Sequence, residues 1–167
     1  RPGTRLTTAA TTPPPPPFHE HEALIAGEAE DGAVAVVRGV QRIALRRGRS
    51  LAAPTDFAAR LLSASRVAHG WVFVTADGTV ASATSFLGRP RDLGRLPCAF
   101  RVDRVSRGLA TAVDADGGLL VTDGSAPFAR AAAPSPVLAA AFASPTLGAV
   151  ILREGAVAVT RDAGRTW

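Results

Sequence analysis

The chain has 167 residues and a formal net charge of +5 at pH 7, a length sufficient for one domain with a hydrophobic core. Its single cysteine excludes an intrachain disulfide and a cysteine-based zinc site. No apolar run reaches the roughly 18 residues that a membrane-spanning helix needs, so no membrane span is expected. The basic residues are all arginine and are scattered among few aromatics, which argues against a nucleic-acid partner.

The first twenty residues differ in composition from the rest. Five consecutive prolines at 13–17 predict polyproline II. Residues 5–12 are rich in threonine and are interpreted as an extended outer strand. His19 and His21 alternate with glutamates and would share one face of a strand, but no third ligand has matching spacing. We therefore expect a solvated segment here and no metal site.

Two series of glycines recur with a period near 40 residues from position 32 onward. The first has gaps of 38, 38 and 40 residues, and the second has gaps of 39, 39 and 38. The series are Gly32, Gly70, Gly108 and Gly148, and Gly39, Gly78, Gly117 and Gly155. Self-similarity at this period, combined with short β-type segments, is typical of a β-propeller.

Each repeat contains three short apolar runs that predict strands rather than helices, because they are brief and mostly aliphatic or β-branched. The first runs lie at 23–26, 59–62, 99–102 and 137–142. The second runs lie at 33–37, 71–75, 109–113 and 149–152, and the third at 40–45, 79–84, 119–122 and 156–160. Glycine turns separate the second and third runs, and Asp-Gly in particular predicts a tight hairpin. An apolar residue closes each following turn, at Leu51, Phe86, Phe128 and Trp167.

The predicted fold class is therefore all-β, a β-propeller of four-stranded antiparallel blades. About four blades are expected within 21–167, near 21–57, 58–98, 99–136 and 137–167. Because the last repeat stops before its own outer strand, the segment 1–20 is expected to supply an outer strand to a preceding or closing blade. We expect the chain to be part of a larger propeller. A β-sandwich is the alternative, since it also has short, evenly spaced strands.

The last eight residues, Thr-Arg-Asp-Ala-Gly-Arg-Thr-Trp, resemble the Asp box (BNR repeat) of sialidase-type propellers, Ser/Thr-x-Asp-x-Gly-x-Thr-Trp. The matching residues are Thr160, Asp162, Gly164, Thr166 and Trp167. The preceding repeat has a degenerate copy that is one residue short, with Thr122, Asp123 and Phe128 retained. The second repeat keeps only Thr84, Ser85 and Phe86, and the first keeps only Gly48 and Leu51.

The resemblance implies a structural role for this motif. Asp162 would accept hydrogen bonds within its own turn, Gly164 would supply a positive φ, and Trp167 would pack between neighbouring sheets. Sialidases of this superfamily use a tyrosine nucleophile, and the chain contains no tyrosine. Xyloglucanase-like members use two aspartates. The candidate aspartates are Asp103, Asp114 and Asp116, and no feature of the sequence identifies a catalytic pair among them.

The chain is also similar to the non-catalytic bacterial propellers related to photosystem II assembly factors, whereas sortilin-type members need a cysteine-rich module. We therefore expect a non-enzymatic scaffold that binds a protein or a glycan through its rim loops, without cofactor, metal or catalytic residues. A fragment of a propeller glycoside hydrolase, with its catalytic residues elsewhere, is the alternative. The absence of Lys, Asn, Tyr and Met suggests a GC-rich bacterium, and we expect a periplasmic or secreted location.

The densest basic run extends from Arg42 to Arg49, on a predicted third strand and its turn. A solvated hairpin is the favoured interpretation, and a phosphate-binding patch is the alternative.

Overall fold

The computed structural model describes residues 23–46, 49–53, 56–97, 99–102, 107–134 and 136–167, with the side chains of 23–25 not described. The segment 1–20, including residues 5–12 and both of its histidines, lies outside these ranges. So do Arg47, Gly48, Cys98 and Asp103.

Four antiparallel sheets follow one another in chain order, and the predicted all-β fold of propeller blades is confirmed. Blade A contains β1 (Ala23–Glu28), β2 (Val34–Arg38), β3 (Gln41–Arg46) and β4 (Arg49–Ala52), with a 3-10 turn, η1 (Glu30–Gly32), between β1 and β2. Blade B contains β5 (Leu61–Val67), β6 (Gly70–Thr75), β7 (Thr79–Ala83) and β8 (Arg91–Arg95). Blade C contains β9 (Phe100–Val102), β11 (Ala110–Asp114), β12 (Leu119–Thr122) and β13 (Ala129–Arg130). Blade D contains β14 (Val137–Phe142), β15 (Gly148–Leu152) and β16 (Val157–Thr160).

Two features of the strands differ from the sequence prediction. The first strand of blade B is predicted at 59–62, whereas β5 begins at Leu61 and continues to Val67. Its buried Ser63 and Ser65 weaken the apolar signal on which the prediction depends. The second difference is β10 (Arg107–Gly108), which pairs in parallel with β5 and so links the third repeat to blade B.

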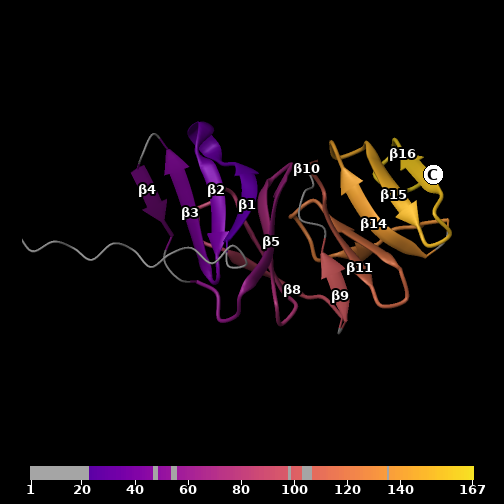
Figure 1. Ribbon diagram of the computed structural model, residues 1–167, viewed down its shortest axis with the longest axis horizontal. Helices are drawn as coiled ribbons and strands as arrows, with labels where there is room; N and C mark the ends of the chain where they lie inside the picture. Colours follow the sequence, from indigo (N-terminus) through magenta and orange to yellow (C-terminus); the bar gives the residue numbers. More distant parts are fainter. Residues whose placement is uncertain (1–22, 47–48, 54–55, 98, 103–106, 135) are drawn as a thin grey trace, which may run out of the picture.

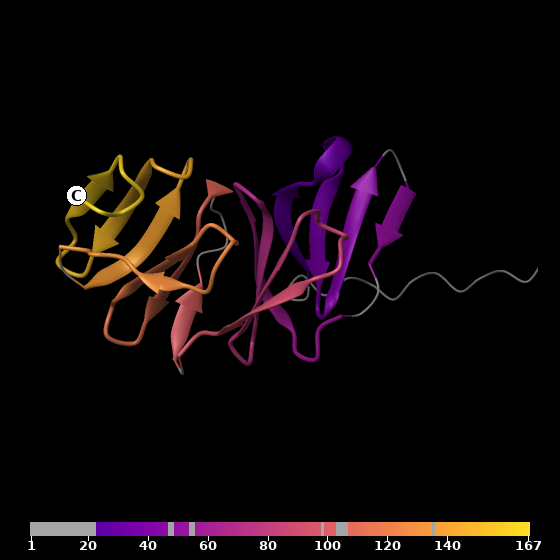
Figure 2. The same cartoon turned by 180° about the vertical axis from the view of Figure 1, so that it is seen from behind.

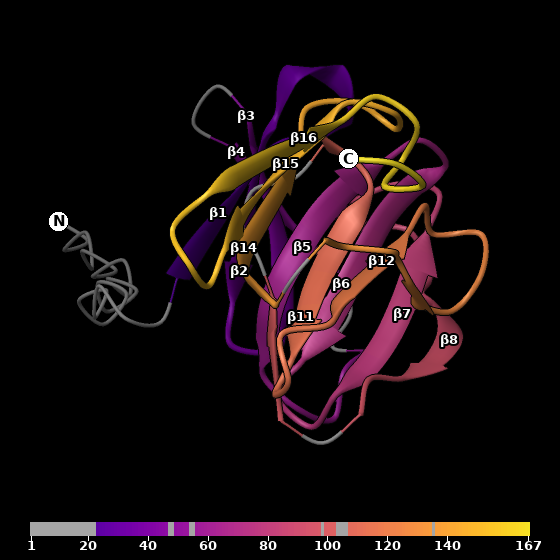
Figure 3. The ribbon, with the colours of Figure 1, turned by 90° about the vertical axis from the view of Figure 1, so that its right-hand side faces the viewer.

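The blades stand side by side along the long axis of the molecule, with blade A at one end and blade D at the other (Figures 1 and 2). Seen from the blade D end, the strands of blade D cross those of blade B at an angle, as expected for stacked, twisted sheets (Figure 3). No helix among the described residues has the length and apolar character needed to cross a membrane.

The hydrophobic core lies between the blades, because both faces of the middle strands are covered. In β6, Trp71 and Phe73 belong to the cluster shared with blade A, whereas Val72 and Val74 belong to the cluster shared with blade C. This is the alternation expected for a strand buried on both sides. A third cluster, between blades C and D, contains Val113, Leu119, Val137, Ala140, Val150 and Leu152.

Neighbouring strands within a blade run in opposite directions. The turn between the second and third strands therefore lies at the same end of the blade as the link that leads to the next blade. We call this end the linker face. A similar backbone hydrogen bond recurs there, in which the carbonyl oxygen of a hairpin glycine accepts from a link residue at 2.8 or 2.9 Å. The pairs are Gly39 with Leu61, Gly78 with Leu96, and Gly117 with Val137. The turns that follow the third strands of the blades lie at the opposite face.

Candidate functional site: the turns of the repeat and two grooves between blades C and D

The turn after β16 is closed by hydrogen bonds to one carboxylate. Oδ1 of Asp162 accepts from the hydroxyl of Thr160 at 2.7 Å and from the amide of Thr166 at 2.8 Å. Its Oδ2 accepts from the hydroxyl of Thr166 at 2.5 Å. These hydrogen bonds, led by that of the Thr166 hydroxyl, lower the pKa of Asp162 to about 2. The partners of all three bonds lie within the turn itself, which fits a structural role for this carboxylate.

Gly164 and Trp167 connect this turn to blade C. Gly164 has φ of +83°, and its amide donates to the hydroxyl oxygen of Thr160 at 2.9 Å. Trp167 packs against the cluster between blades C and D, beside Val121 and Ala131. Its indole nitrogen is buried and has no hydrogen-bond partner among the described atoms.

The shorter turn after β12 uses the same residue types with different partners. The hydroxyl of Thr122 donates to the carbonyl oxygen of Ala126 at 2.6 Å and accepts from the amide of Gly124 at 3.0 Å. Oδ1 of Asp123 accepts from the amide and hydroxyl of Ser125 at 2.9 and 2.6 Å, which lowers its pKa. Phe128 packs against the cluster between blades B and C.

The turn after β7 has no aspartate, and two charged residues of blade A bind its backbone. Oε2 of Glu30 accepts from the amide of Phe86 at 3.0 Å, while its Oε1 accepts from the indole nitrogen of Trp71 at 2.9 Å. Arg42 donates to the carbonyl oxygens of Phe86 and Gly88, both at 2.7 Å.

The prediction of a solvated hairpin is therefore wrong for Arg42, which is 1% exposed. Its position on a strand facing blade B buries it against aromatic rings, where paired hydrogen bonds compensate for lost solvation. Arg46 and Arg49 are exposed as expected, so the described residues of this run do not form a single basic patch. Neither Glu30 nor Arg42 lies in a motif, and the sequence carries no signal for their pairing with a turn about 50 residues away.

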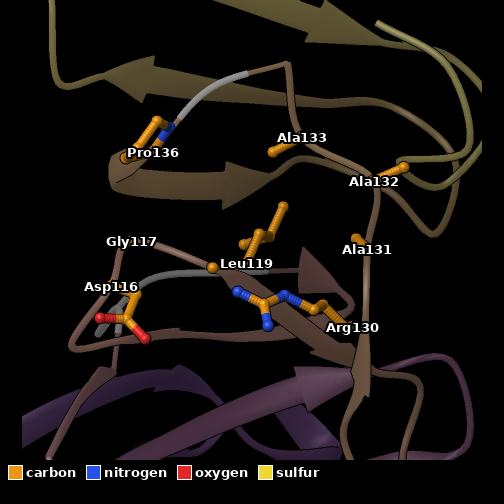
Figure 4. A pocket seen from close by; sticks show the side chains of 9 residues that line it. Asp116, Gly117, Leu119, Arg130, Ala131, Ala132, Ala133 and Pro136 are labelled. Atoms are coloured by element: carbon orange, nitrogen blue, oxygen red, sulfur yellow. The ribbon is translucent and has the colours of Figure 1, made fainter.

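A cavity of about 540 Å³ opens at the linker face beside blade C, and we call it the outer groove (Figure 4). Its walls are mostly small and apolar, with one acidic and one basic side chain at the edge. The lining residues are Asp116, Gly117, Gly118, Leu119, Arg130, Ala131, Ala132, Ala133 and Pro136.

A second cavity of about 310 Å³, the inner groove, lies between the first strands of blades C and D. It shares Gly117 with the outer groove, and the hydrogen bond from Val137 to Gly117 crosses between the blades at this point. Its lining residues are Ala99, Phe100, Arg101, Val113, Asp114, Ala115, Gly117, Val137, Leu138 and Arg153.

Asp114 stabilises the blade C hairpin. Its Oδ1 accepts from the amides of Asp116 and Gly118 at 3.0 and 2.7 Å, and its Oδ2 lies 3.3 Å from the guanidinium of Arg130. A Cβ on Gly118 would collide with this ion pair and displace the Arg130 guanidinium from the Asp114 carboxylate. Asp116 is an exposed turn residue. Within the described residues, no group of three or more His, Cys, Asp or Glu side chains is arranged to hold a metal ion.

Solved structures that resemble the chain include one human protein and one from Cyanidioschyzon merolae. The crystal structure of human WBSCR16 has a TM-score of 0.54 and 18% identity, over 75% of this chain and 44% of that one. YCF48 from Cyanidioschyzon merolae has a TM-score of 0.55 and 14% identity, over 81% of this chain and 54% of that one. This chain thus covers about half the length of the structures it matches. No protein-family model and no curated protein matches the sequence.

At these identities the likeness concerns the fold alone, and it agrees with the arrangement of the four sheets: the chain has a β-propeller-type fold.

Proposed function

We propose that the chain is a non-enzymatic Asp-box propeller scaffold that binds an extended segment of a partner protein in the outer groove. One observation carries this proposal: the groove combines a wall of small apolar side chains with one acidic side chain, Asp116, and one basic side chain, Arg130. Ala131, Ala132 and Ala133 leave room for a bound main chain, and the exposed Pro136 offers apolar contact.

The composition of the groove favours a protein segment over a glycan. Sugar rings are bound largely by aromatic faces and by several planar polar groups, and the outer groove contains no aromatic residue among those that line it. Asp114 is a poor candidate for a catalytic carboxylate of a hydrolase, because Arg130 and two backbone amides already engage it. A general acid or nucleophile needs a carboxyl group that can reach the substrate.

The test is a selection of random peptides displayed on phage against the folded protein, followed by affinity measurement. Ala132→Trp fills the outer groove and should weaken the selected peptides by at least about tenfold. Ala68→Trp is the matched control, because Ala68 is exposed in the turn between β5 and β6 at the opposite face. It should bind as the unaltered protein does. Circular dichroism should show that both variants fold.

Selected peptides that bind Ala132→Trp with unchanged affinity would overturn the proposal, as would a selection that yields no peptide. A glycan array provides the competing outcome. Glycan binding that Ala132→Trp abolishes, in the absence of peptide binding, would replace the protein partner with a carbohydrate.

A further inference from the structure

Two arginines from different blades line the inner groove. Arg101 lies on β9 of blade C, and Arg153 follows β15 of blade D. Both side chains are exposed, and neither forms an ion pair with a described residue. Two exposed arginines thus line one cavity of about 310 Å³ without a described counter-ion.

The acidic residue that lines the same cavity does not neutralise them. The carboxylate of Asp114 is directed to Arg130 and to the amides of Asp116 and Gly118. The described residues of the inner groove therefore carry an excess of positive charge, and a ligand that supplies negative charge would satisfy it.

The remaining walls define the shape of that ligand. Phe100 and the exposed Leu138 contribute apolar surface to the cavity, whereas Val113 and Val137 are almost fully buried in its wall. Gly117 borders both grooves, so the two cavities adjoin at the hairpin of blade C. A Cβ at this position would lie 2.7 Å from Cβ of Pro136, which shows how closely the link packs on the hairpin.

We infer that the inner groove binds a carboxylate of the partner segment, held by Arg101 and Arg153, while the rest of the segment occupies the outer groove. This inference rests on the proposed function, because it assumes a peptide in the outer groove. A guanidinium matches a carboxylate with two parallel N–H donors, and such charge-assisted hydrogen bonds are about twice as strong as neutral ones. The partner is therefore an acidic segment, with Glu or Asp placed a short distance from its apolar residues.

The experiment compares two pools of acetyl- and amide-capped peptides that share the sequence selected on the outer groove. One pool carries Glu at each flanking position in turn, and the other carries Gln. The unaltered protein should bind the best Glu peptide at least about tenfold more tightly than its Gln counterpart. The double variant Arg101→Gln/Arg153→Gln should bind the two equally.

The matched control is Arg46→Gln/Arg161→Gln, which also removes two exposed arginines, both at the opposite face. It should retain the preference for Glu. The preference should also weaken with added salt, as expected for an exposed ion pair.

The two proposals can fail separately. Equal binding of Glu and Gln peptides by the unaltered protein, with binding still lost in Ala132→Trp, would overturn the carboxylate site alone. A Glu preference that survives in Arg101→Gln/Arg153→Gln would also overturn it. Binding of inorganic phosphate that depends on both arginines, without a preference for Glu, would reassign the site to a free oxyanion. If neither pool binds, both proposals fall.

Discussion

Arg42 of blade A donates a hydrogen bond of 2.7 Å to the carbonyl oxygen of Phe86 in blade B, 44 residues later in the chain. The same guanidinium binds the carbonyl oxygen of Gly88 at 2.7 Å and pairs with Asp56 at 2.8 Å. Its central carbon lies 5.0 Å from the centre of the Phe73 ring. Burial lowers the pKa of Arg42 and the ion pair opposes this, so the group remains protonated. A buried cation of one blade therefore stabilises the degenerate turn of the next.

Replacement of Arg42 by methionine tests this interaction. The variant leaves two carbonyl oxygens and the Asp56 carboxylate without their partner, and removal of one member of a buried pair commonly costs about 3 kcal/mol or more. We expect the free energy of unfolding in urea to fall by about that amount. Arg46→Met is the control, because Arg46 is exposed on the same strand, and it should change stability by less than about 0.5 kcal/mol. Equal effects of the two substitutions would contradict the assigned role of Arg42.

Arg42 also illustrates which parts of the structure could be predicted from the sequence. The hairpins could be predicted because Asp-Gly at 77–78 and 116–117 is a local signal whose backbone requirements are met within a few residues. The partners of Arg42 lie 44 and 46 residues away on another sheet. Nothing within the surrounding sequence distinguishes this arginine from the exposed Arg46. The contacts of a side chain between two blades are set by the way the sheets pack. The sequence around that residue does not reveal this packing.

The candidate site shows the same limit. Asp162 and its turn could be predicted, because the residues that contact it lie within four positions of it. The two grooves could not, because Arg101 and Arg153 line one cavity only when blades C and D lie next to each other. Neither arginine lies in a motif, and their shared cavity is a property of the fold.

Glu30 provides the second test of the contact between blades A and B. Glu30→Ala would leave the indole nitrogen of Trp71 and the amide of Phe86 without a hydrogen-bond acceptor. An unsatisfied buried donor costs about 1 to 3 kcal/mol, so we expect a loss of stability in that range. Trp71 is fully buried, and a shift of its fluorescence would report the change directly. Glu28→Ala, at an exposed neighbouring position, should leave both stability and fluorescence unchanged.

Alanine substitutions at Gly108 and Gly155 distinguish the cost of a steric collision from the cost of backbone strain. Both have a positive φ, +97° and +88°, which costs an alanine about 1 kcal/mol. A Cβ on Gly108 would collide with the backbone of Ser144 and Pro145 in blade D, whereas a Cβ on Gly155 would meet nothing within 4 Å. We expect Gly155→Ala to cost about 1 kcal/mol and Gly108→Ala about 3 kcal/mol, by chemical denaturation. Similar losses for the two variants would show that β10 does not pack against blade D in this way.

Asp162 makes the stability of blade D depend on pH. Hydrogen bonds from Thr166 and Thr160 favour the ionised carboxylate and hold its pKa at about 2 in the folded protein, below the ordinary value of 3.8. A lowered folded-state pKa means that the stabilisation is complete above the ordinary value and is lost as the pH falls toward 2. The difference in free energy of unfolding between the unaltered protein and Asp162→Asn should therefore shrink between about pH 4 and pH 2.

Thr166→Val, which removes the hydroxyl donor but keeps the backbone amide, should show a smaller dependence of stability on pH than the unaltered protein. A difference between the unaltered protein and Asp162→Asn that stays constant across this range would mean that the carboxylate charge does not stabilise the turn.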